Sequence, residues 1–183
     1  MRRMKLLTCV GLAAAMLCSA CCSTLDLGNI LDLLTGNLNL MGQAERVVWV
    51  TYPNAMLIEA QGAPSTGTAT NAADIDRWAF VFDADSTNPG SGTVTIQYSN
   101  GSFGEPVYVA QGWVGTIFER LPRVLSLGDA VTNMRDGGFT DDFSAVTLRK
   151  ALTFPVPTEA SYAFSLPGQF VLVGAETGTI TTE

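Results

Sequence analysis

Between Ser126 and Ile180, the apolar positions change from a helical period to an alternating one. Apolar side chains first recur at the i, i+3, i+4 and i+7 spacing of a single buried stripe, at Leu127, Ala130, Val131 and Met134. Ser126 is a typical N-cap, and Asp129 completes a carboxylate version of the capping box. Gly137-Gly138 then supplies a left-handed stop. The pattern predicts one amphipathic helix.

From Val146 the apolar period becomes two, which is typical of strands. One face carries Val146, Leu148, Leu152 and Phe154, and Lys150 interrupts it. The alternation returns at Tyr162, Phe164 and Leu166, and Pro167-Gly168 makes a tight connection into a strand at 170–173. These segments predict a curled antiparallel sheet with one helix across it, which is an α+β unit.

The ending of this stretch has the pattern Val171, Val173, Ala175, Thr177, Gly178, Ile180. Physically, it reads as a strand, a turn that needs a positive φ at Gly178, and a re-entering strand. Following a helix and two strands, it resembles the PepSY domain and its relatives, which usually carry Asp where Gly174 stands here. The resemblance implies a helix-plus-sheet fold and an association with inhibiting or restraining secreted hydrolases.

Residues 39–103 repeat the same order of elements. The matching segments are 39–44 with 126–130, 55–59 with 145–149, 78–82 with 162–166, and 94–103 with 171–180. Agreement in order, face and turn position predicts a tandem duplication with Trp78 and Tyr162 at equivalent places. Two such repeats resemble the architecture of the secreted β-lactamase inhibitory protein, in which the sheets join into one concave surface.

The repeats set the expected domain organisation. We expect a signal peptide at 1–20, a lipid-anchored tether at 21–38, a first PepSY-like repeat at 39–121 and a second at 122–183. The first repeat would include an extra strand at 106–109 and a connector at 113–121, either a short helix or an irregular crossing.

The first twenty residues have the features of a secretory signal. A basic start (Arg2, Arg3, Lys5) precedes an apolar run and a small-residue ending at Ala20. Residues 17–21 resemble the lipobox of bacterial lipoproteins, in which the cysteine after the cleavage point receives the lipid. Here Cys18 occupies the place where Leu is usual. We expect lipidation of Cys21 in the bacterial cell envelope, with cleavage after Ala20 and release into the periplasm as the alternative.

The segment at 23–40 is unusually apolar for a tether. Its eight large aliphatic side chains are too many for a linker that stays solvated, at Leu25, Leu27, Ile30, Leu31, Leu33, Leu34, Leu38 and Leu40. One interpretation is an amphipathic segment on the membrane near the anchor. The other is a short helix at 29–34 docked on the folded domain.

Charge and composition exclude several functions. Three of the ten basic residues lie in the leader, so the mature chain carries seven basic against 17 acidic residues, a formal charge of −10. Nucleic acid and anionic lipid headgroups are therefore poor partners. Histidine is absent, and cysteine occurs only at positions 9, 18, 21 and 22. Ser-His-Asp and Cys-His catalysis, Cys/His zinc sites and haem ligation are excluded, and we expect no cofactor.

Three polar features are candidate sites. The segment at 83–90 offers the hard oxygens that calcium needs, but it departs from EF-hand spacing at Asn88, so we expect a hairpin turn without metal. Asp141 and Asp142 could do acid/base work, yet adjacent residues point to opposite sides and a solvated loop is favoured. Lys150 is either a buried functional amine or a lysine that guards a sheet edge.

Aromatic residues give a better functional indication. Tyr and Trp dominate protein interfaces, and the candidate binding residues are Trp49, Tyr52, Trp78, Tyr98 and Trp113. We expect a non-enzymatic lipoprotein that binds a protein partner in the cell envelope, with inhibition of a secreted hydrolase as the role that the resemblance implies. The alternatives are an envelope scaffold without inhibitory action and a carboxylate-dependent hydrolase using Asp141 or Asp142.

Overall fold

The computed structural model describes residues 40–122, 124–153 and 157–183, all within one compact unit, Gly36–Glu183. The predicted signal peptide, the lipidated Cys21, the tether at 21–38 and its short helix lie outside these residues and stay predictions. No helix among the described residues is long and apolar enough to cross a membrane.

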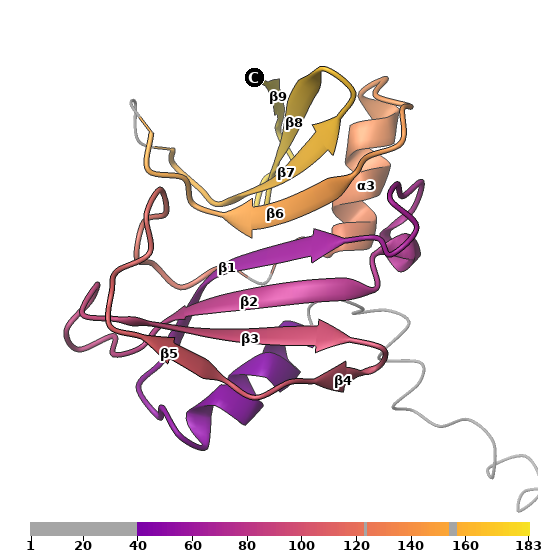
Figure 1. Cartoon of the computed structure of the whole chain (residues 1–183). Helices are drawn as coiled ribbons and strands as arrows, with labels where there is room; N and C mark the ends of the chain where they lie inside the picture. Colours follow the sequence, from indigo (N-terminus) through magenta and orange to yellow (C-terminus); the bar gives the residue numbers. More distant parts are fainter. Residues whose placement is uncertain (1–39, 123, 154–156) are drawn as a thin grey trace, which may run out of the picture. The chain divides into compact units, whose positions relative to one another are not determined.

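Nine strands form one antiparallel sheet in the described part of the chain (Figure 1). Their bounds are β1 Met56–Ala63, β2 Arg77–Asp83, β3 Thr93–Ser99, β4 Ser102–Phe103, β5 Val107–Val109, β6 Ala145–Arg149, β7 Ser161–Leu166, β8 Gln169–Gly174 and β9 Ile180–Thr182. The spatial order is β4-β3-β2-β1-β6-β7-β8-β9, and β5 pairs with β3 on the same side as β4. The predicted α+β class and the extra strand are confirmed.

The helix α3 (Leu127–Asp136) begins and ends as its sequence predicts. The Ser126 hydroxyl accepts a hydrogen bond from the Asp129 N–H at 3.1 Å, and the Ser126 N–H donates to the Asp129 carboxylate at 3.2 Å. Gly137 is the C-cap, and Gly138 has a φ of 92°. The four residues of the predicted stripe are the buried ones, so α3 covers the sheet with that face.

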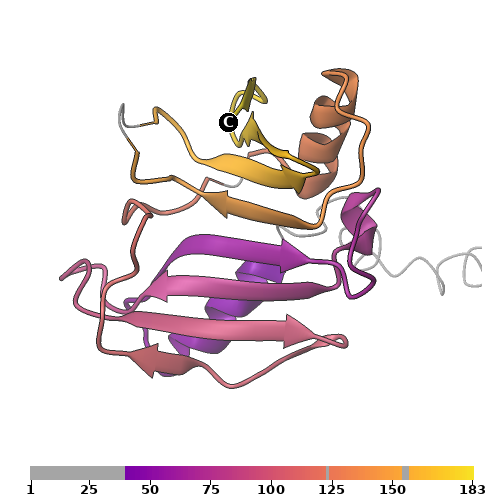
Figure 2. The ribbon, with the colours of Figure 1, turned by 45° about the horizontal axis from the view of Figure 1, so that its top comes forward.

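A second helix, at residues 40–49, covers the other half of the sheet. Met41, Ala44 and Val48 are its most buried apolar residues, and they belong to the same hydrophobic cluster as the buried face of α3. Figure 2 shows this helix behind β1, β2 and β3. Both helices therefore lie on one face of the sheet, which we call the covered face.

Strand register explains the core on the covered face. Successive cross-strand partners form one apolar row across seven strands, namely Ile96, Phe80, Ala60, Leu148, Tyr162, Val173 and Ile180. Every residue of this row except Ile180 is at most 1% exposed. Because side chains alternate along a strand, the neighbouring residues point to the opposite face, which we call the open face.

Each half of the described chain has a helix followed by four strands, β1–β4 and β6–β9, and the first half adds β5. The strands β1 and β6 pair antiparallel where the halves meet. Trp78 and Tyr162 are the second residues of β2 and β7, and both are buried. The registers differ, since Trp78 lies opposite Gly62 while Tyr162 lies opposite Leu148. The pairing of β1 with β2 also contains an irregularity between Leu57 and Glu59, which the pairing of β6 with β7 lacks.

The strand β6 is shorter than the alternation predicts. It ends at Arg149, and Leu152, expected on its apolar face, is 64% exposed. Phe154 lies outside the described residues. The interruption at Lys150 was the sequence signal for this end, because a charged residue on a buried face cannot continue the core.

Candidate functional site

Small and polar side chains predominate along the open face of the sheet. One cross-strand row on this face runs through Gln97, Ala79, Gln61, Thr147, Ala163, Leu172 and Thr181. No helix among the described residues lies on this face, as Figures 1 and 2 show. The row offers hydrogen-bonding groups on an uncovered sheet, which is the kind of surface that a partner can contact.

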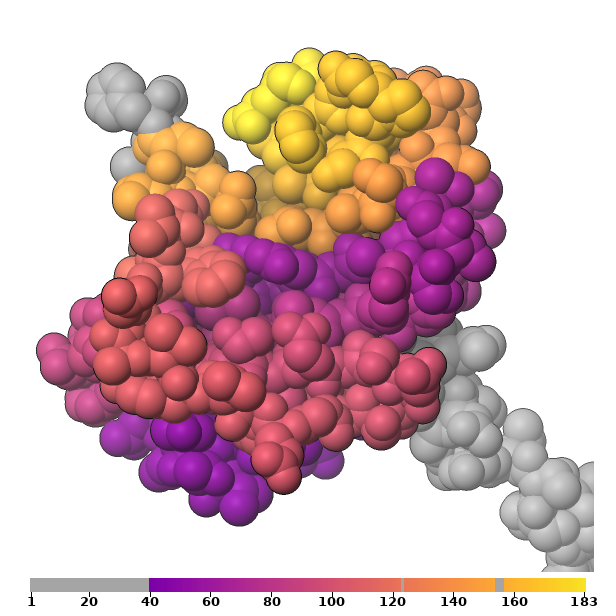
Figure 3. All heavy atoms as spheres, viewed as in Figure 1, coloured from indigo at the N-terminus to yellow at the C-terminus, as the bar shows by residue number. Residues whose placement is uncertain are grey.

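A groove of about 390 Å³ lies on the open face of the second half. Its floor includes Thr147, Ser161, Ala163, Ser165 and Leu172, whose modest size leaves space above the backbone. Figure 3 shows the hollow between the orange segment that follows β6 and the yellow atoms of β8 and β9. A more open hollow of about 360 Å³ continues over the first half.

Charged side chains line parts of this groove. Arg149, Glu159 and Glu183 contribute to it, and so does Phe170, which is 51% exposed. The groove thus combines hydroxyl groups, carboxylates and one exposed aromatic ring. This mixture is typical of a surface that binds a protein segment by both polar and apolar contacts.

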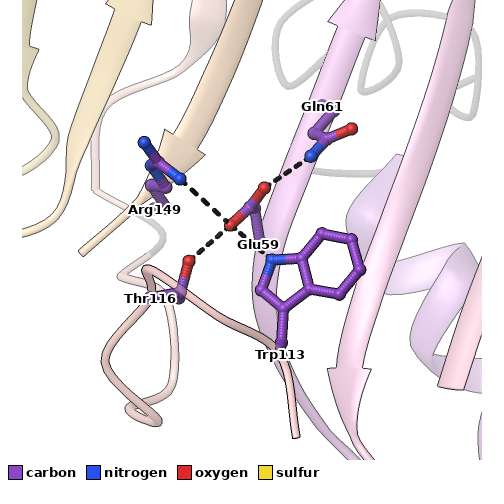
Figure 4. Close-up of polar contacts among 5 residues, drawn as sticks. All are labelled: Glu59, Gln61, Trp113, Thr116 and Arg149. Carbon is purple, nitrogen blue, oxygen red and sulfur yellow. Dashed lines mark hydrogen bonds and ion pairs between the residues drawn. The ribbon is translucent and has the colours of Figure 1, made fainter. Parts of the chain in front are cut away.

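Glu59 is the buried anchor of the open face (Figure 4). Its side chain is 1% exposed and accepts hydrogen bonds from Gln61 Nε2 at 2.6 Å, from Trp113 Nε1 at 2.9 Å and from the Thr116 hydroxyl. Arg149 Nη1 lies 3.8 Å from Glu59 Oε2. A carboxylate is stable in such a place only when donors satisfy it, and these four groups do so.

The Glu59 contacts hold residues 110–119 across the open face, and we call this segment the strap. The Thr93 hydroxyl donates to the Gln111 carbonyl at 3.2 Å, and the Ile117 N–H donates to the Lys150 carbonyl at 2.8 Å. Thr116 also forms an isolated bridge with Ala151. The connector is therefore an irregular crossing, and it joins the two halves of the sheet on their open side.

The five predicted aromatic residues do not meet on one surface. Trp113 lies in the strap against Glu59. Trp78, by contrast, is 5% exposed, and its ring stacks on Phe80 in the core with centroids 5.8 Å apart. The half-buried ring of Tyr98 packs against the ring of Phe103 on the covered side, with centroids 5.0 Å apart. Trp49, 36% exposed, and half-buried Tyr52 lie at the end of the 40–49 helix.

The turn at 83–90 is held by its own hydrogen bonds. Asp83, which is 0% exposed, accepts from the Gly90 N–H at 3.1 Å, and burial raises the pKa of its carboxyl, with a further increase from the Asp85 charge. The side-chain and backbone hydrogen bonds from Thr87 lower the pKa of Asp85. Within the described ranges, no three His, Cys, Asp or Glu residues come together as metal ligands would.

The other polar candidates have structural partners. Asp141 and Asp142 are exposed, and the Asp142 carboxylate accepts from the Thr70 hydroxyl at 3.0 Å. The Lys150 ammonium lies 2.7 Å from the Glu119 carboxylate. Because β6 is interior, lying between β1 and β7, the prediction that Lys150 guards a sheet edge is wrong.

The turn after β8 is held by the carboxylate of Glu159, which comes from the segment before β7. Glu159 accepts the N–H groups of Glu176 and Thr177, at 2.8 and 3.1 Å, and the Thr177 hydroxyl at 2.5 Å. Burial by itself raises the Glu159 pKa, but these three hydrogen bonds together outweigh it, so the pKa lies below its usual value. Gly178 has the positive φ, 71°, that the sequence predicts.

Sequence reasoning missed the residues that organise this face, Glu59, Gln61, Thr116 and Arg149. A signal was present, because Glu59 stands at the end of an apolar run and aligns with Arg149 in the second copy. The carboxylate of Glu59 and the guanidinium of Arg149 occupy directly opposite positions on β1 and β6.

No protein-family model matches the chain, and no curated protein matches it in sequence. Among solved structures, a candidate lipoprotein of Clostridium difficile 630 is similar over 78% of this chain and 91% of its own length, with a TM-score of 0.52. The two sequences are 8% identical, so the likeness concerns the fold alone.

Proposed function

We propose that the chain is a non-enzymatic lipoprotein of the bacterial cell envelope whose open sheet face binds a protein partner. The observation that carries this proposal is the groove of about 390 Å³ on a sheet face that no described helix covers. Residues 17–21 supply the lipobox-like signal, and the fold likeness to a candidate lipoprotein agrees with it.

The chemistry of the open face favours binding over catalysis. The carboxylate of Glu59 is occupied by the strap, and Arg149 is its ion-pair partner, so neither group is poised for proton transfer. The hydrolase alternative rests on Asp141 and Asp142, which are exposed and lie in a loop. Neither carboxylate lines the two hollows of the open face.

We further propose that the two halves are PepSY-like tandem repeats, 39–121 and 122–183. Their common order of elements and the burial of Trp78 and Tyr162 at corresponding places support this proposal. A superposition of the two halves that aligned the four strands in order would agree with it. A superposition that needed a different strand order would leave only the second half PepSY-like.

A photocrosslinking amino acid at Ser165, in the groove, tests the binding face in living cells. The matched control position is Thr132, which is exposed on α3 on the covered side. We expect partner adducts from Ser165 and few or none from Thr132. Equal adducts from both positions, or none from Ser165, would place the partner elsewhere.

The captured partner also separates inhibition from scaffolding. If the partner is a secreted hydrolase, adding the soluble domain in increasing amounts should lower its turnover. A bound partner whose activity does not change would support the scaffold alternative. Turnover of a substrate by the domain itself, lost in the Asp141→Asn/Asp142→Asn variant, would overturn the non-enzymatic proposal.

A further inference from the structure

The strand β5 forms an apolar edge of the sheet. Among the described strands it pairs with β3 alone, through Val107 with Thr95, Tyr108 with Val94 and Val109 with Thr93. In Figure 1 it lies along the outer side of β3. Its three side chains are 60%, 48% and 46% exposed. An edge strand of this kind offers unpaired backbone groups beside apolar side chains.

Apolar exposure continues from β5 onto the covered side. The Tyr108 ring stacks on Tyr52, with centroids 6.0 Å apart and planes 15° from parallel. Trp49 and Val50, 36% and 85% exposed, precede Tyr52 at the end of the 40–49 helix. We call these residues, with Val107 and Val109, the apolar corner. It contains five of the nine exposed large hydrophobic residues of the described chain, so this exposure is concentrated in one place.

The opposite edge of the sheet differs in character. There, β9 carries Thr181 and Thr182 and is followed by Glu183, so polar groups meet solvent. Natural sheets protect their edges with charged residues, proline or bulges. Pro106 stands before β5, but no charge lies within the strand itself. Of the two edges, β5 is therefore the one suited to pairing.

We propose that β5 pairs antiparallel with β5 of a second copy of the chain, so that the two sheets join across a two-fold axis. The sequence Val107-Tyr108-Val109 reads the same in both directions, so an antiparallel self-pair centred on Tyr108 places identical side chains opposite each other. Each valine would face a valine, and Tyr108 would face Tyr108 of the second copy. Glu105 would face Gln111 rather than another carboxylate, so no like charges would meet.

Charge argues against a membrane surface as the occupant. The mature chain has a formal charge of −10, which opposes approach to anionic lipid. The same charge makes two copies repel each other at long range, although the paired strands themselves carry none. Salt screens such repulsion without weakening apolar contacts, so the dimer should tighten as ionic strength rises.

Sedimentation equilibrium of the chain from Ser23 onward, which contains the whole compact unit, tests this pairing. We expect a monomer–dimer equilibrium over the micromolar to millimolar range. Val109→Lys should raise the dimer Kd at least roughly tenfold, because it places a charge against valine at two symmetric sites. The control is Val114→Lys on the strap, where Val114 is 88% exposed and the Kd should not change.

Disulfide trapping tests the register separately. The chain from Ser23 has no cysteine, and residues opposite each other in antiparallel strands lie about 4.5–5.5 Å apart between Cα atoms, within disulfide reach. Tyr108→Cys should therefore form a linked dimer much faster than Val114→Cys. Monomer throughout the range, equal effects of the two lysine variants or equal trapping rates would each overturn the proposal.

Discussion

The carboxylate of Glu159 occupies the space that a side chain at Gly174 would need. A Cβ at Gly174 would clash with Glu159 Oε1 and would also crowd the Thr177 hydroxyl. In the PepSY pattern this position is usually Asp. Here an acid from the segment before β7 accepts the two N–H groups of the turn, and Gly174 leaves room for it.

Substitutions at Gly174 and Glu159, made singly and together, should show that the two positions are energetically coupled. Gly174→Asp should lower the free energy of unfolding by roughly 2 kcal/mol, because it adds a clash and a second carboxylate. Glu159→Ala should cost about 1 kcal/mol through the lost hydrogen bonds. In the double variant the introduced aspartate can take over the N–H groups, so the loss should be smaller than the sum. Denaturant unfolding of all four chains measures this, and strictly additive losses would contradict it.

Asp83 and Asp85 should affect stability in opposite directions. Burial raises the Asp83 pKa, so the fold favours its neutral form, and ionisation costs stability as pH rises through the folded-state pKa. Asp83→Asn should therefore stabilise the protein at neutral pH by about 1 kcal/mol, and the gain should disappear in acid below the unfolded-state pKa.

Asp85 is the matched comparison for this measurement. Its pKa is lowered by the Thr87 hydrogen bonds, so its contribution is present above the unfolded-state pKa and is lost as pH falls through the folded-state pKa. Asp85→Asn should destabilise the protein at neutral pH. Thermal unfolding measured from pH 3 to pH 8 gives the sign of the stability change for each variant. The same sign for the two variants would show that burial does not dominate at Asp83.

Glu59 should control the strap. Glu59→Gln removes the ion pair with Arg149 and turns an acceptor of three hydrogen bonds into a side chain that also donates, which should cost roughly 2–3 kcal/mol of stability. Hydrogen exchange at Ile117 and Leu152, whose N–H groups join the strap to the segment after β6, should speed up. Glu119→Gln is the control, since Glu119 is 56% exposed and its pair with Lys150 is worth at most about 1 kcal/mol. Unchanged exchange in Glu59→Gln would mean that other contacts hold the strap.

Membrane retention should depend on Cys21. With lipoprotein signal peptidase blocked, we expect the precursor to accumulate, and Cys21→Ala should abolish retention because no thiol remains for the lipid. Cell fractionation with immunoblotting measures both effects. Normal processing and retention of the variant would exclude this anchor, and a soluble periplasmic form of the unaltered chain would favour cleavage after Ala20.

Sequence periodicity predicted the elements whose pattern is local. The stripe and caps of α3, and the alternation of Tyr162, Phe164 and Leu166, specify structure within a few residues. The face on which a side chain lies is harder to predict, because it depends on where the helices pack. Trp78 illustrates this, since an aromatic residue on an alternating strand suits an interface and a core equally well.

The contacts on the open face could not be predicted either, but the reason is different. Glu59 and Arg149 meet because β1 pairs with β6, and this pairing joins segments that no local pattern connects. Trp113 was recognised as a candidate contact residue, but its partner Glu59 could be found only once that topology was known. The pairing of distant strands therefore determines which residues meet at the site. Local periodicity determines the helices and strands that carry those residues.

The central pairing of β1 with β6 also sets an order for folding. β1 can pair with β2 as soon as the first half exists, but its other edge must wait for β6, since Glu59 and Arg149 are 90 positions apart. Closing so long a loop is slow compared with forming the local hairpins. During that interval the inner edge of β1 is open to strands of other chains. Aggregation during refolding should therefore depend on how quickly the second half arrives, and a chain that ends before β6 would keep this vulnerable edge permanently.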